Sequence, residues 1–125
     1  MAEKTIGTIY PAAEAESRFG SVHYSIEIGT EELKSFLNRT NNLLMFNIKD
    51  EKLYILGDGR ESVYPAGFAP EQSEVYTVYS KSKIEELINE GKADRTIIEQ
   101  RKDVLSVTNG IYTLENSSWC PPFCS

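Results

Sequence analysis

The sequence predicts an α+β domain, a mostly antiparallel sheet of about six or seven strands with two or three helices. Three observations predict this class. Residues 21–28 alternate apolar and polar side chains, as a strand with one buried face does. Two later segments carry apolar residues at helical spacing. Asn109-Gly110 separates two β-prone segments, which is the strongest local signal for a hairpin.

The first forty residues predict a strand, a short helix, a second strand and a longer helix. The first strand covers 5–10 and ends before Pro11, and the helix-prone run 12–16 follows it. In the strand 21–28 the apolar residues at even positions share one face. Thr30 is expected to cap the next helix. The inner face of that helix has apolar residues at i, i+3 and i+4 spacing: Leu33, Phe36 and Leu37.

The middle of the chain predicts a hairpin, a loop and a further strand. The β-prone segments 43–49 and 52–56 flank the turn Asp50-Glu51, as the strands of a hairpin do. Glycine and proline recur over 57–74, which predicts a long loop. A strand is expected again at 75–79.

The last third predicts a helix and a second hairpin. Ser82 and Glu85 have the spacing of a capping box at the start of the helix. The inner face of this helix is expected to consist of Ile84, Leu87 and Ile88. The segment 96–102 suits a strand in its first half and a helix in its second half. The segments 104–108 and 111–115 are the expected strands of the hairpin.

We expect a single globular domain over 1–118 and a distinct tail over 119–125. Both cysteines, Cys120 and Cys124, lie in this tail. Three interpretations of it stay open. It is a poorly ordered end, or one docked on the body through its two aromatic residues. It forms a disulfide, within the tail or between two chains. It is a segment that is processed, as in a precursor.

Composition limits the classes of partner. The hydrophobic fraction of 40% and the charged fraction of 26% are those of a globular protein, so disorder is not expected. The net charge of −6 argues against general nucleic-acid binding, which depends on neutralising phosphates. No apolar run has the length of a membrane span, and the first residues do not have the pattern of a signal peptide. We therefore expect a cytoplasmic protein that does not bind a membrane.

Few residues of the chain suit catalysis or metal binding. His23 is the only histidine, and the body before the tail contains no cysteine. A catalytic triad or a zinc site needs several such side chains. We expect no metal site, no cofactor and no catalytic residue, and hence a non-catalytic protein. An enzyme that works with tyrosine, arginine and carboxylate groups stays open as an alternative.

Arginines recur close to aromatic residues in three stretches of the chain. Guanidinium groups match phosphate or carboxylate oxygens, and aromatic faces stack on planar rings. The same residue types anchor protein interfaces, and tyrosines in strands are commonly packing residues. As candidate ligand-binding residues we select Arg18, Phe19, His23, Tyr24, Arg60, Tyr64, Phe68, Arg95 and Arg101.

These observations favour a protein that sequesters or senses an anionic, ring-bearing, nucleotide-like small molecule. A single open site of this kind binds weakly, so a tight binder is expected to be a homo-oligomer with the loop 57–74 as a lid. Small acidic domains without catalytic motifs are frequent among phage and mobile-element accessory antagonists. The alternative is an acidic, immunity-type inhibitor that docks on a basic protein partner.

Overall fold

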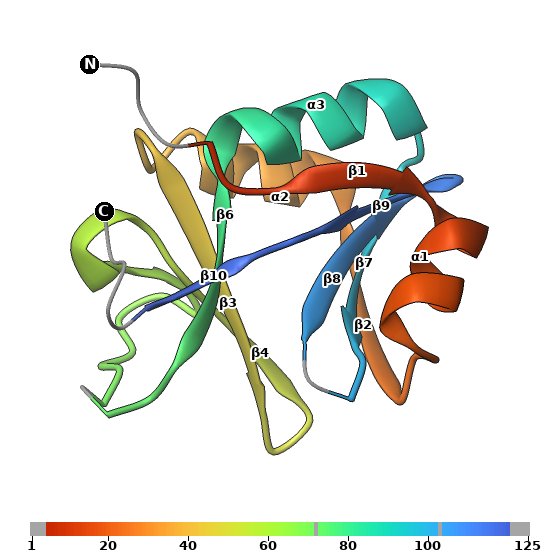
Figure 1. Ribbon diagram of the computed structural model, residues 1–125. Coiled ribbons are helices and arrows are strands. Elements are labelled where there is room, and N and C mark those ends of the chain that lie inside the picture. The colour runs from red at the N-terminus through yellow and green to blue at the C-terminus, as the bar shows by residue number, and fades with distance from the viewer. Residues whose placement is uncertain (1–4, 72, 103, 121–125) are drawn as a thin grey trace.

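The computed structural model describes residues 5–71, 73–102 and 104–120. The α+β class is confirmed, but the expected strand number was too low: the described residues form ten strands in two antiparallel sheets, with three α-helices (Figure 1). In chain order the elements are β1 (Thr8–Pro11), α1 (Ala12–Phe19), β2 (Tyr24–Gly29), α2 (Thr30–Leu37), β3 (Leu43–Lys49), β4 (Lys52–Leu56), a 3-10 turn (Asp58–Arg60), β5 (Ser62–Tyr64), β6 (Tyr76–Ser80), α3 (Lys81–Gly91), β7 (Arg95–Gln100), β8 (Leu105–Asn109), β9 (Tyr112–Glu115) and β10 (Ser118–Cys120).

The first sheet has the order β1-β9-β8-β7-β2, and the second has the order β10-β6-β3-β4-β5. The described chain crosses between the sheets three times, and at the last crossing, between β9 and β10, Asn116 has a left-handed φ of 62°. Asparagine tolerates this conformation better than most residues, so it suits the corner. Two of the strands missed from sequence, β5 and β10, have only three residues each, too few for a period-2 pattern to be recognised.

The main core lies between the two sheets and beneath α2 and α3, which cover the same end of the molecule (Figure 1). It contains the predicted inner faces of both helices: Leu33, Phe36, Leu37, Ile84, Leu87 and Ile88. A smaller apolar cluster covers the other face of the second sheet, and the partly buried Tyr54 and Phe68 pack against it. The second sheet is therefore covered on both faces, whereas α1 packs beside β1 and β9 of the first sheet.

Both predicted helix caps were wrong. Thr30 is already the first residue of α2, and its hydroxyl donates a hydrogen bond to the carbonyl oxygen of Ala93 at 2.7 Å. Ser80, not Ser82, precedes α3, and its hydroxyl accepts a bond from the backbone N–H of Ile6 at 2.7 Å. In both cases the hydroxyl binds a distant segment, because tertiary contacts compete with local capping.

The two predicted hairpins are confirmed. β3 and β4 have the expected bounds, and both turn residues between them adopt left-handed φ values. In the second hairpin the turn is shifted by one residue, because Asn109 pairs with Tyr112 and so belongs to β8. Its side-chain oxygen accepts a bond from the N–H of Ala93 at 2.9 Å, which holds the α3–β7 connection against the sheet. No helix among the described residues is long and apolar enough to cross a membrane.

Candidate functional site

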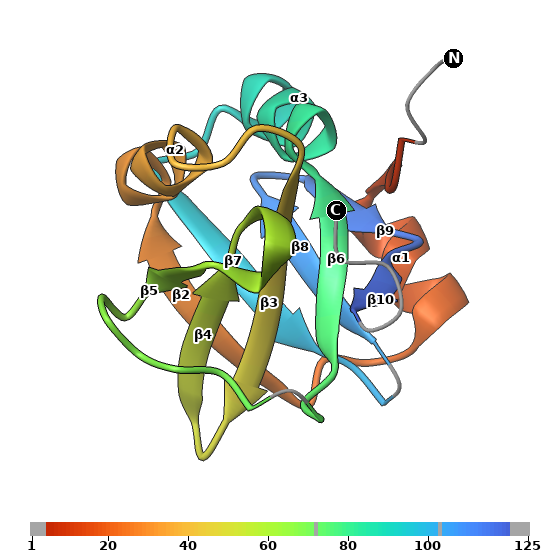
Figure 2. The same cartoon turned by 90° about the vertical axis from the view of Figure 1, so that its left-hand side faces the viewer.

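A cleft of about 370 Å³ lies between β2, one edge strand of the first sheet, and the β4–β5 edge of the second sheet. One wall is formed by residues 26–29 of β2, and the other by residues 51–54, by Tyr64 at the end of β5 and by Pro65. Figure 2 views the molecule from the side of β2, β4 and β5. Arg95 and Glu32 complete the lining. We call this space the seam cleft, because it lies between two sheet edges whose described strands do not pair with each other.

Two contacts bracket the seam cleft. The hydroxyl of Tyr24 donates a hydrogen bond to the carbonyl oxygen of Glu51 at 3.2 Å, which links β2 to the β3–β4 turn. The rings of Phe36 and Tyr64 lie 5.3 Å apart and link α2 to β5. The two sheet edges are thus held close together, but no strand pairing joins them within the described residues.

The backbone of β2 is open on the side of the cleft. Among the described strands β2 pairs with β7 alone, so alternate residues of its six present N–H and C=O groups to the cleft. Such an edge is a template for a further strand. A segment of another chain in extended conformation could therefore continue the first sheet here.

Charges in the seam cleft favour a cation slightly. Its lining has the two cations Lys52 and Arg95 and three carboxylates, those of Glu27, Glu32 and Glu51. The Arg95 Nε lies 2.7 Å from a carboxylate oxygen of Glu27, and both side chains are more than half exposed. The rings of Tyr54 and Tyr64 also line the cleft, and their faces attract cations.

The nine candidate residues chosen from sequence do not form one site. Tyr64 and Arg95 line the seam cleft, and Tyr24 closes one end of it. His23 precedes β2 and is exposed, with its backbone N–H donating to the Gln100 carbonyl at 2.7 Å. Of the remaining five, four lie on two other faces of the molecule and Arg101 is buried.

Arg60 and Phe68 lie on the outer face of the second sheet. The Arg60 guanidinium stacks 5.4 Å from the ring centroid of Tyr76 and donates to the carbonyl oxygens of Cys120 and Glu71 at 3.1 and 2.8 Å. The ring of Phe68 lies 5.2 Å from that of Tyr54. These contacts fasten the loop after β4 to the outer face of the second sheet.

Arg18 and Phe19 lie at the end of α1. The Arg18 Nε is 3.1 Å from the Glu14 carboxylate, and the guanidinium lies 5.3 Å from the ring centroid of Tyr10. Phe19 meets the same tyrosine edge-on at 5.6 Å. These contacts hold α1 against β1, on the side of the first sheet opposite to the core.

Arg101 is buried beneath the end of α1. Its guanidinium donates to the carbonyl oxygen of Gly20 and to the hydroxyl of Ser106, and it lies 3.3 Å from both Glu99 and Glu115. Burial raises the pKa of the Glu115 carboxyl, while the Ser106 hydrogen bond and the Arg101 charge oppose that rise. The guanidinium of Arg101 is therefore paired with groups inside the protein.

Other residues that line the seam cleft were not among the candidates from sequence, notably Glu27, Glu32, Lys52 and Tyr54. Glu27 comes beside Arg95 only through the pairing of β2 with β7, which joins residues 68 positions apart. The position of Tyr54 on its strand could have been predicted from the alternation of residues in the sequence. Tyr54 alternates with the buried Leu53 and Ile55, so its side chain belongs to the other face of β4.

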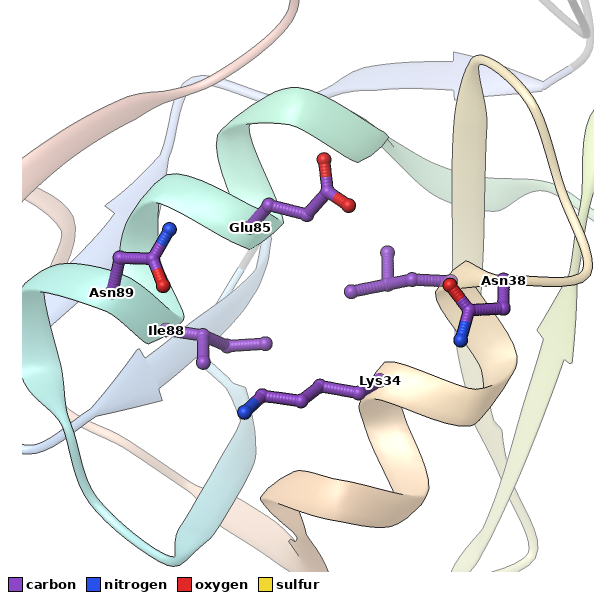
Figure 3. A pocket seen from close by; sticks show the side chains of 6 residues that line it. Lys34, Asn38, Glu85, Ile88 and Asn89 are labelled. Atoms are coloured by element: carbon purple, nitrogen blue, oxygen red, sulfur yellow. The ribbon is translucent and has the colours of Figure 1, made fainter.

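A second groove, of about 350 Å³, separates α2 from α3 (Figure 3). Leu37 and Ile88 supply its apolar lining. Lys34 projects from α2 and Asn38 follows the last residue of that helix, while Glu85 and Asn89 project from α3. The amine of Lys34 also lies 3.0 Å from Glu31.

Within the described ranges no three His, Cys, Asp or Glu side chains group closely enough to hold a metal ion. The first two tail residues, Trp119 and Cys120, belong to β10, while Cys124 and the question of its bonding lie outside the described residues. Comparisons of the chain with protein-family models, curated proteins and solved structures found no match.

Proposed function

We propose that this protein is a non-catalytic, acidic docking protein that takes an extended, basic segment of a partner protein into the seam cleft. The observation that carries the proposal is the open backbone edge of β2 beside a cleft with three carboxylates and two cations. Strand addition supplies main-chain hydrogen bonds, and the cleft side chains supply specificity. The role is that of an immunity-type inhibitor or antagonist.

The electrostatics of the whole chain support a basic partner. The net charge is −6, which accelerates encounter with a cationic surface. Each of the five arginines already contacts an oxygen atom of the protein. An anion would have to compete for these guanidinium groups. A cation in the seam cleft competes with Arg95 for Glu27, but it also meets the carboxylates of Glu32 and Glu51 and two tyrosine rings.

The test uses a fluorescent peptide of alternating lysine and valine, with a glutamate–valine peptide as its control. Anisotropy should show binding of the lysine peptide alone, and its affinity should fall as salt rises from 50 to 300 mM. Inverting the charge of the cleft by Glu27→Lys should weaken the binding. Equal affinity for both peptides, or affinity that salt does not change, would contradict the proposal.

A second candidate is the anionic, ring-bearing small molecule expected from sequence, bound in the same cleft. Arg95, Lys52 and the tyrosines Tyr54 and Tyr64 favour it, since they place cations and rings around one space. An open site of this size would bind weakly, so closure by a second copy of the chain belongs to this candidate. Sedimentation in the presence of the nucleotide used as probe measures that closure.

Arg95→Ala separates the two candidates by the sign of its effect. Losing the cation should weaken nucleotide binding but strengthen binding of the lysine peptide, because Glu27 is released. The expected change is about 1.5- to 5-fold in each direction, since the pair is exposed. Arg18→Ala is the matched control, because it removes a similar exposed ion pair on the other side of the first sheet. A change of the same sign for both probes counts against a shared site.

A further inference from the structure

We propose a second binding site, for an alkylated ammonium group, in a cavity of about 240 Å³ on the outer face of the second sheet. Three aromatic rings, two carboxylates and one amine line it: Tyr54, Phe68, Tyr76, Glu71, Glu74 and Lys49. Aromatic cages of this composition recognise quaternary ammonium groups through the negative faces of their rings. The cavity shares Tyr54 with the seam cleft but contains no residue of β2, so a ligand here goes beyond the proposed docking function.

The rings form walls that are set at an angle to one another. The centroids of Tyr54 and Phe68 lie 5.2 Å apart with an angle of 56° between their planes. Tyr76 is 1% exposed, and burial raises the pKa of its hydroxyl to about 12. It therefore contributes a neutral ring at neutral pH. The loop that holds Phe68 supplies one wall, and β4 and β6 supply the others.

The carboxylates add negative charge at the same place. The pKa of Glu74 is held below its usual range by its hydrogen bond with Lys49, whose Nζ lies 2.8 Å from a Glu74 oxygen. The other Glu74 oxygen accepts the backbone N–H of Glu71 at 3.2 Å. An anionic ligand would face the carboxylates of Glu71 and Glu74 and the faces of the rings, so the lining selects against an anion.

One of these rings already lies beside a cation of the chain. The guanidinium of Arg60 lies 5.4 Å from the ring centroid of Tyr76. The amine of Lys49, at the end of β3, already forms an ion pair with Glu74, so a ligand must displace it. This makes Lys49 an internal competitor. The cavity is smaller than the roughly 300–1,000 Å³ of sites for drug-sized ligands, which suits a head group rather than a whole nucleotide.

An alkylated ammonium group has two sources, a free small molecule or a methylated lysine side chain of another protein. Two probes distinguish them: choline, and a short peptide that contains trimethyllysine. Binding of the peptide alone would assign the site to a protein partner, and binding of choline at least as tightly would assign it to a small molecule. Either result supports the cage.

The decisive comparison is between choline and its neutral isostere 3,3-dimethylbutan-1-ol, measured by NMR titration of the backbone amides. Choline should bind more tightly, and the shifted amides should belong to β4, β6 and the loop around Phe68. Phe68→Leu keeps the apolar volume but removes a ring, and should weaken choline binding by about 2- to 30-fold. Glu74→Gln should also weaken it, while Lys49→Met should strengthen it.

Lys83→Met is the control for Lys49→Met, because it removes a comparable lysine–glutamate pair, at 3.1 Å, on α3. It should leave choline binding unchanged. Circular dichroism of each variant verifies folding. Glu27→Lys, which alters the seam cleft and lies outside this cavity, should leave choline binding unchanged. Equal affinity for choline and the neutral isostere, or unchanged choline binding in both Phe68→Leu and Glu74→Gln, would overturn the proposed cage.

Discussion

Arg101→Ala should lower the free energy of unfolding by about 3–5 kcal/mol at pH 7.5, because it leaves buried carboxylates without their cation. The Arg101 side chain is 3% exposed, and that of Glu115, 3.3 Å away, is 1% exposed. Glu99, also 3.3 Å away, is 14% exposed. Water therefore has little access to replace the lost hydrogen bonds. The loss in the free energy of unfolding is then expected to be that of a buried ion pair with one partner removed.

The stability lost through Arg101→Ala should be smaller at pH 5, and the direction of this pH dependence follows from the raised pKa of Glu115. Burial raises its pKa in the folded protein above the unfolded value, so the folded state binds this proton more tightly. Stability contributed by the protonated form is lost as the pH rises through the folded pKa. Without Arg101 this pKa rises further. Acidification from pH 7.5 to 5 should then restore part of the stability lost by the variant.

Urea denaturation followed by circular dichroism at the two pH values measures both effects. Arg101→Ala combined with Glu115→Gln should be more stable at pH 7.5 than Arg101→Ala alone, because the uncompensated charge is gone. Arg18→Ala, whose ion pair is 58% and 45% exposed, should cost only about 0–1 kcal/mol. A loss below about 1 kcal/mol for Arg101→Ala, or the same loss at both pH values, would refute the reasoning.

Three further substitutions test the fold by urea denaturation. Gly91→Ala should cost about 1–3 kcal/mol, because its Cβ would overlap the backbone carbonyl of Asn109; wild-type stability would contradict this close approach. Asp58→Ala should cost about 1.5–3 kcal/mol, because the carboxylate accepts backbone N–H groups of residues 41–43; Asp58→Asn should cost less. Tyr79→Phe should cost about 0.5–1.5 kcal/mol, since its buried hydroxyl donates to a β8 carbonyl at 2.6 Å; a more stable variant would count against that bond.

The α+β class and both hairpins were predictable because their signals are local. Asp50 and Glu51 sit between two β-prone runs, and the resulting strands have the predicted bounds. The inner faces of α2 and α3 followed from helical spacing, which depends only on residues within a few turns. The undecided segment 96–102 forms the strand β7 over 95–100, because it pairs with β2 and β8 on its two sides.

The candidate site was predictable only in part. The candidate residues were chosen by residue type. Two of these candidates, Tyr64 and Arg95, do line the seam cleft. Their neighbours could not be identified, because Glu27 reaches Arg95 by cross-strand pairing and not by proximity along the chain. The role of Arg101 was equally hidden, since its burial depends on α1 and three strands meeting around it.

The sequence by itself determined the fold class, the positions of the main turns, the apolar faces of the helices and the acidic charge of the protein. Each of these depends on residue type and short-range spacing. Only the tertiary structure decided that there are two sheets, that β2 keeps a free edge beside β5, and which arginines are internally engaged. Those properties arise from contacts between residues far apart in the chain, so no local pattern carries them.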